Sequence, residues 1–111
     1  MAKGLLLLYP TKVEGMMKKV KETDIESLYS AVLTLRTMGE AKSFFRDLLT
    51  ATEIEELARR WKAARLLTDG VPYTRIIEQT GLSSTTVARV ARWVKGGMGG
   101  YQKALKRTAR S

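Results

Sequence analysis

Residues 73–95 read YTRIIEQTGLSSTTVARVARWVK, and their pattern is the clearest structural signal in the chain. Apolar residues recur at helical spacing on both sides of a short break, so two short helices are expected over 73–80 and 84–95. Gly81 can take the left-handed conformation that ends the first helix, and Ser83 can cap the second. This order predicts a helix-turn-helix, in which the helices are held together by Ile76, Ile77, Leu82, Val87 and Val90. Thr80 stands where such a unit usually has a more apolar residue.

The second of these helices has one apolar and one polar side. At 100° per residue, Val87, Val90, Ala91 and Val94 cluster on one side, opposite Thr85, Arg89 and Arg92. Thr methyl groups can meet thymine methyls in a major groove, and Arg can reach guanine or phosphate. An ordinary solvated helix face is the alternative. The pattern predicts DNA-binding residues at Thr74, Arg75, Ser83, Ser84, Thr85, Thr86, Ala88, Arg89, Arg92 and Lys95.

The charge is unevenly distributed along the chain. The net charge is +9 over 111 residues, and residues 71–111 contribute +7 of it, because Glu78 is their only acid. Residues 24–70 carry −1 and residues 1–23 carry +3. A strongly basic segment that coincides with the helix-turn-helix indicates an anionic partner, and double-stranded DNA fits best.

Composition excludes several classes of function. The chain has no Cys and no His, which removes disulfides, thiol nucleophiles, zinc clusters and histidine acid–base catalysis. We therefore expect no enzyme, no catalytic residue and no bound metal. The apolar run Leu5–Leu8 is too short for a membrane span or a signal peptide, so a cytoplasmic protein with no membrane partner is expected.

The rest of the chain is also helical in pattern. Asp24 can cap a helix that Gly39 ends, and a shorter helix follows over 40–49. The sequence Thr50-Ala51-Thr52-Glu53 is a capping box that opens a longer helix, ended by Asp69-Gly70. This helix carries an apolar stripe of Ile54, Leu57, Ala58, Trp61, Ala64 and Leu67.

No strand-like alternation is present, so the fold class is all-α. We expect a leader over residues 1–23, which is disordered or includes a mis-assigned start. A multi-helix domain follows over 24–95, with the helix-turn-helix at 73–95. A Gly-rich hinge and a basic C-terminal tail make up 96–111, and 101–111 forms one more helix.

Several of these segments together are similar to a known family. Residues 49–57, the helix that ends at Asp69-Gly70, residues 73–92 and the GMGGY sequence at 97–101 resemble the Trp repressor superfamily, and within it the YerC/YecD-like family. The resemblance implies an intertwined homodimer whose two helix-turn-helix units lie about 34 Å apart on a pseudo-palindromic DNA site. Apolar residues that a second copy could cover are Leu33, Phe44, Phe45, Leu66 and Leu67; the alternative is that they form the core of a monomer.

The same resemblance implies an effector site for L-tryptophan, to which Thr50, Arg60 and Arg89 correspond. Two neighbouring positions depart from the family pattern. Val90 stands where the Trp repressor has a Gly, and Trp93 stands where it has a Ser. Both side chains crowd the pocket, and the indole of Trp93 could occupy it. L-Tryptophan is therefore not expected as a corepressor, and no cofactor is expected.

Three functions remain open. The first is a sequence-specific transcriptional regulator, a repressor that occupies an operator as a dimer. The second is an accessory protein that binds nucleic acid without sequence preference through its basic C-terminal third. The third is a helical adaptor that binds only other proteins, in which Arg89 and Arg92 would not affect DNA affinity.

Overall fold

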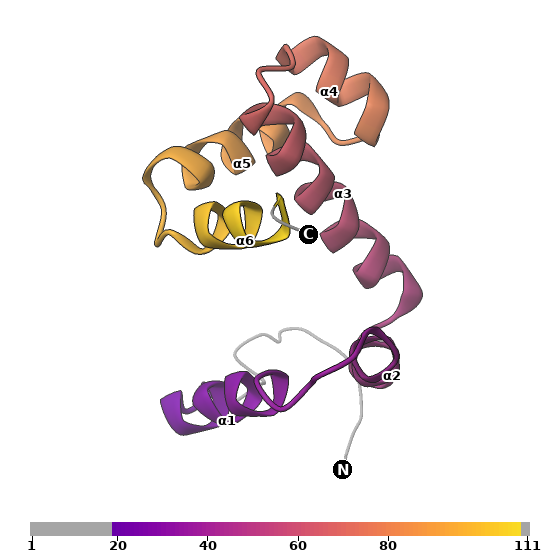
Figure 1. Cartoon of the computed structure of the whole chain (residues 1–111), viewed down its shortest axis with the longest axis vertical. Coiled ribbons are helices and arrows are strands. Elements are labelled where there is room, and N and C mark those ends of the chain that lie inside the picture. The colour runs from indigo at the N-terminus through magenta and orange to yellow at the C-terminus, as the bar shows by residue number, and fades with distance from the viewer. Residues whose placement is uncertain (1–18, 110–111) are drawn as a thin grey trace. The chain divides into compact units, whose positions relative to one another are not determined.

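The structure, a computed structural model, describes residues 19–109, which divide into two compact units, 19–42 and 43–109. The described residues form six α-helices and no strand, which confirms the all-α fold (Figure 1). The helices are α1 (Glu22–Val32), α2 (Met38–Leu48), α3 (Ala51–Thr68), α4 (Tyr73–Thr80), α5 (Ser84–Gly96) and α6 (Gly100–Ala109). Residues 1–18 of the expected leader lie outside the described residues, and its last two belong to α1.

The predicted end of the first helix is wrong. Helix α1 ends at Val32, where Thr34 Oγ1 donates a hydrogen bond to the carbonyl of Ala31 at 2.6 Å. Gly39, the expected terminator, lies in the first turn of α2. The Glu40 N–H donates to Thr37 Oγ1 at 3.1 Å, so Thr37 starts this second helix in the way that a capping threonine does.

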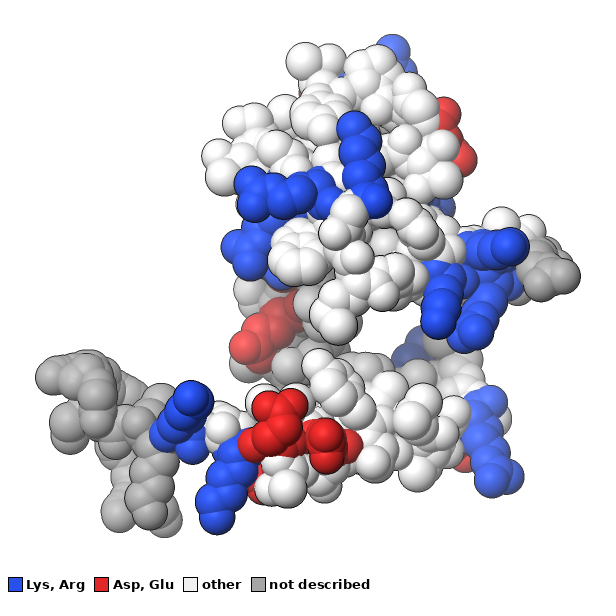
Figure 2. Space-filling view, turned by 90° about the vertical axis from the view of Figure 1, so that its left-hand side faces the viewer, with Lys and Arg blue, Asp and Glu red and all other residues white. Residues whose placement is uncertain are grey.

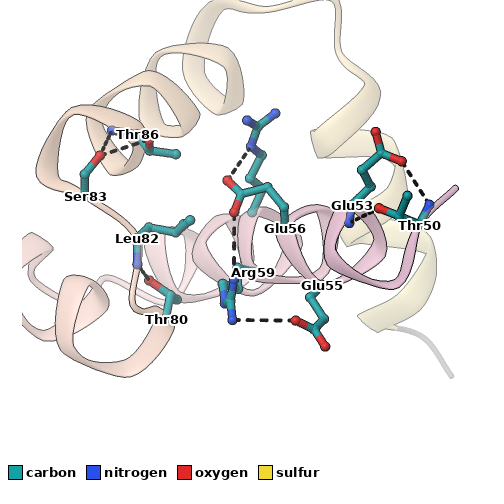
Figure 3. Close-up of polar contacts among 10 residues, drawn as sticks. Thr50, Glu53, Glu55, Glu56, Arg59, Thr80, Leu82, Ser83 and Thr86 are labelled. Carbon is teal, nitrogen blue, oxygen red and sulfur yellow. Dashed lines mark hydrogen bonds and ion pairs between the residues drawn. The ribbon is translucent and has the colours of Figure 1, made fainter. Parts of the chain in front are cut away.

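Helix α3 begins as the sequence predicts. The Glu53 N–H donates to Thr50 Oγ1 at 3.1 Å, and the Thr50 N–H donates to Glu53 Oε1 at 2.9 Å (Figure 3). This reciprocal pair satisfies two of the N–H groups that a helix start leaves unpaired. The capping box is confirmed.

The core of the second unit lies where α4 and α5 pack against the C-terminal half of α3 (Figure 1). Ala63 and Ala64 are fully buried there, and their small side chains let the neighbouring helices approach closely. The N-terminal half of α3 contributes no buried residue, and Leu57 is 49% exposed. The predicted apolar stripe of α3 is therefore covered along only part of its length. The core cluster consists of Ala63, Ala64, Ile76, Leu82, Val87 and Val90.

Helix α6, expected at the C-terminus, is present and packs into the second unit rather than standing apart as a tail. Tyr101 and Leu105 pack against the core cluster. The Tyr101 ring stacks on Trp61 with centroids 6.4 Å apart and planes 15° apart. The amide of Gln102 donates to the carbonyl of Val94 at 2.8 Å. These contacts fasten α6 to α3 and α5.

Candidate nucleic-acid interface

The turn between α4 and α5 depends on two residues, Thr80 and Gly81. Gly81 has a φ of 75°, and no heavy atom lies within 4 Å of the place where a Cβ would stand. Glycine is therefore needed there for the left-handed backbone and not for space. Thr80 is 6% exposed, and its Oγ1 donates a hydrogen bond to the carbonyl of Ile76 at 2.7 Å. The same oxygen accepts a hydrogen bond from the Leu82 N–H at 3.2 Å (Figure 3). A hydroxyl that both donates and accepts a hydrogen bond thus fills a position where an apolar residue is more usual.

Ser83 caps α5, as its place in the sequence predicts. Its Oγ accepts from the Thr86 N–H at 3.1 Å and donates to Thr86 Oγ1 at 3.0 Å (Figure 3). Both hydroxyl groups are consequently engaged in starting the helix. Of the ten predicted DNA-binding residues, Ser83 and Thr86 are therefore the two whose hydroxyl groups bond to each other at the start of α5.

The other eight predicted residues are exposed. Val87, Val90 and Ala91 turn one side of α5 into the core. By helical spacing, the exposed predicted residues of α5 form two adjacent rows. One row holds Thr85, Arg89 and Arg92, and the other holds Ser84, Ala88 and Lys95. Thr74 and Arg75 lie apart from these rows, in the first turn of α4.

The basic residues of this region are not neutralised by acidic neighbours. The ion pairs between described residues join Arg59 and Arg60 to Glu55 and Glu56 on α3, at 3.5–4.0 Å. None of them involves a basic residue of α4, α5 or α6. Figure 2 shows separate groups of Lys and Arg side chains on the part of the chain that holds these helices. Unpaired positive charge of this kind attracts a polyanion.

The three residues expected at an effector site do not come together within one chain. Thr50 begins α3 and Arg60 lies about 15 Å further along its axis, while Arg89 is on α5. A described cavity of about 320 Å³ involves none of the three; it lies beside α3 and α6, and Trp61, Arg65 and Asp69 are among its lining residues.

Val90 and Trp93, the two positions of that expected site that depart from the family pattern, differ in burial. Val90 is buried in the core cluster, with 4% exposure. Trp93 is 47% exposed. Within one chain, Val90 therefore turns toward the core, whereas the Trp93 ring is half-exposed.

Two further properties concern residues 19–109 only. None of the helices found there is both long and apolar enough to cross a membrane. No group of three or more Asp and Glu side chains within that range is arranged to hold a metal ion.

Comparisons with known proteins agree with this architecture. The sequence profile of the Trp repressor protein family matches residues 23–109. The uncharacterized protein YerC of Bacillus subtilis (strain 168) is 37% identical over 89 residues, which cover 80% of this chain and 86% of YerC.

Two solved structures have a similar fold. A TrpR-like protein from Eubacterium eligens superposes with a TM-score of 0.76 at 36% identity, covering 80% of this chain and 92% of the other. A protein described as a candidate Trp repressor from Staphylococcus aureus gives a TM-score of 0.75 at 32% identity, covering 80% and 89%. Sequence profile, relative and fold agree, and the chain belongs to the Trp repressor family.

Proposed function

We propose that this chain is a sequence-specific transcriptional regulator that binds duplex DNA with α5 in the major groove. Membership of a family of DNA-binding regulators supports the general kind of function. The observation that carries the proposal is the placement of Thr85, Arg89 and Arg92 on the exposed side of α5, directly opposite its buried side. A protein bound to an operator in this way excludes polymerase, so repression in the cytoplasm is the proposed mode of action.

The exposed residues have different proposed roles. Ser84 and Thr85 are short and lie in the first turn of α5, so they can approach base edges, and the methyl group of Ala88 allows the same close approach. Arg89 can reach guanine or phosphate. The remaining contacts, to phosphates, are proposed for Thr74, Arg75, Arg92 and Lys95.

We also propose that the protein acts as a homodimer. Helices α1 and α2 have 11 residues each and no buried residue, and isolated helices of that length are only marginally stable. Leu33 is 84% exposed and Leu57 is 49% exposed. A second copy would cover such residues and place two copies of α5 one helical turn of DNA apart. Leu66 and Leu67 do not support this proposal, because they pack against the chain's own core.

Selection of bound duplexes from a random pool tests the proposal. We expect one pseudo-palindromic sequence to bind about 10³-fold more tightly than bulk DNA at physiological salt. Arg89→Ala and Arg92→Ala together should weaken binding to it by at least about tenfold. Arg59→Ala is the control, since it removes one positive charge from α3, where Arg59 already pairs with Glu55 and Glu56.

The other two functions predict different results. Equal affinity for all duplexes would favour an accessory protein that binds nucleic acid without sequence preference. An unchanged affinity of the Arg89→Ala, Arg92→Ala variant would favour a protein-binding adaptor. Calorimetry with L-tryptophan tests the effector separately: saturable binding at micromolar concentration would contradict the proposed absence of this corepressor.

A further inference from the structure

Trp93 lies on the exposed side of α5, although the family resemblance assigns its position to a ligand site. It follows Arg89 by one helical turn, which makes the two side chains neighbours on the helix surface. At 100° per residue it is displaced by about 40° from Arg89 and by about 60° from the buried Val90, so it lies at the edge between the exposed and the buried side. About half of the side chain, 47%, is exposed.

The backbone of Gly97 lies close against the Trp93 ring. A Cβ on Gly97 would stand 2.7 Å from Cε3 of the ring and would also collide with the carbonyl oxygen of Trp93. The ring therefore lies against a stretch of chain that only glycine can form. The Gly97 N–H donates to that same carbonyl at 3.0 Å, so the backbone that lies against the ring is held by the last turn of α5.

The surroundings of Trp93 favour an anionic partner over an apolar one. Helix α5 contains three basic residues, Arg89, Arg92 and Lys95, and no acidic residue. An indole presents an apolar face and one N–H donor with no acceptor. That combination, flanked by guanidinium groups, matches the sugar–phosphate backbone of DNA, where apolar deoxyribose alternates with phosphate acceptors.

We propose that Trp93 is a DNA-contacting residue, whose ring packs against a deoxyribose and whose Nε1–H donates to a phosphate oxygen beside the bases read from the start of α5. This rests on the proposed function. A backbone contact carries no sequence information, so Trp93 sets the affinity and the register of α5 and not the choice of bases.

Affinity measurements on the full chain test this with the selected operator and with bulk duplex. Trp93→Ala should weaken binding to both by a similar factor, about tenfold, and Trp93→Phe, which lacks the N–H, by a smaller factor. Met98→Ala is the control, because Met98 is 96% exposed but lies beyond α5. Unchanged affinity of Trp93→Ala would overturn the proposal, and weaker binding to the operator alone would replace a backbone contact by base readout.

Trp93 fluorescence shows whether DNA or a second copy of the chain covers the ring. In a Trp61→Phe background Trp93 is the only tryptophan. Acrylamide should quench it readily in the free protein and at least about twofold less after operator binding, as expected for a ring that becomes buried. Strong shielding before DNA is added would overturn the proposal. If the wild-type chain selects no operator, the proposed function fails; if it does and Trp93→Ala binds equally well, only the role of Trp93 fails.

Discussion

At the scale of single residues, the Thr80 hydroxyl is the least expected structural feature of the turn between α4 and α5. Replacing Thr80 by Val keeps the shape but leaves the buried Leu82 N–H without its acceptor. We expect a loss of about 1–3 kcal/mol in the free energy of unfolding, measured by urea denaturation. Thr80→Ser should retain most of the stability. Thr108→Val is the matched control, since Thr108 is exposed and its hydroxyl only donates, to the carbonyls of Ala104 and Leu105. Equal losses in the Val variants at 80 and 108 would contradict this account.

The residues whose roles the sequence predicts correctly are those whose signals are local. Gly81 and Ser83 act through their own backbone and nearest turn, so their types at that spacing are sufficient. The roles of Thr80 and Trp93 are harder to predict, because they depend on burial by other helices. Helical spacing places Trp93 between Arg89, about 40° away, and the buried Val90, about 60° away, so spacing alone does not decide whether the ring is covered.

At the scale of elements, the connection between α5 and α6 depends on Gly97. A Cβ at this position meets a backbone atom as well as the Trp93 ring, and backbone cannot move aside as easily as a side chain. Gly97→Ala should therefore displace α6 and cost about 1–3 kcal/mol.

The neighbouring glycine supplies the control for this prediction. A Cβ on Gly96 would meet nothing within 4 Å, and Gly96 ends α5, so Gly96→Ala should be neutral or stabilise by about 1 kcal/mol. Thermal unfolding of the two variants measures the difference, and equal midpoints would contradict the proposed crowding.

The boundary between α1 and α2 shows how competing local signals are resolved. The sequence Thr37-Met38-Gly39-Glu40 has the same spacing as the capping box at 50–53, and its threonine does cap α2. Gly39 alone predicts a helix end, but a capping pattern that begins two residues earlier outweighs a single glycine. The sequence also predicts the extent of α3, but not that only its C-terminal half is covered, because which neighbours reach a helix depends on tertiary packing.

At the scale of the whole molecule, the proposed DNA binding should depend on the positive charge of the chain and on the formation of a dimer. Each phosphate that is no longer neutralised should reduce the slope of log K against log salt by about 0.9. The triple variant Arg89→Ala, Arg92→Ala, Lys95→Ala should therefore lower the slope by about 1–3 units, depending on how many of these side chains reach phosphates. Filter binding across a salt series measures this, with Arg59→Ala as the control. An unchanged slope would place the phosphate interactions elsewhere.

The dimer proposal predicts that stability depends on concentration. A tenfold dilution removes about 1.4 kcal/mol from the stability of a dimer, which corresponds to a fall in Tm of about 3–6 °C for a dimer of this chain. Leu33→Lys should abolish this dependence if Leu33, 84% exposed in one chain, is covered by the partner. A Tm that is the same at all concentrations would indicate a monomer.

Because only the C-terminal half of α3 is covered, the rates of amide hydrogen exchange should differ along this helix. Amide hydrogens near Ala63 and Ala64 should exchange with deuterium only when the packed core opens, whereas those around Leu57, on the uncovered half of the same helix, should exchange through fraying. If a second copy covers that half, its exchange slows as protein concentration rises while the other half keeps its rate. The two halves of one helix would then report separately, one on the opening of the core and the other on assembly.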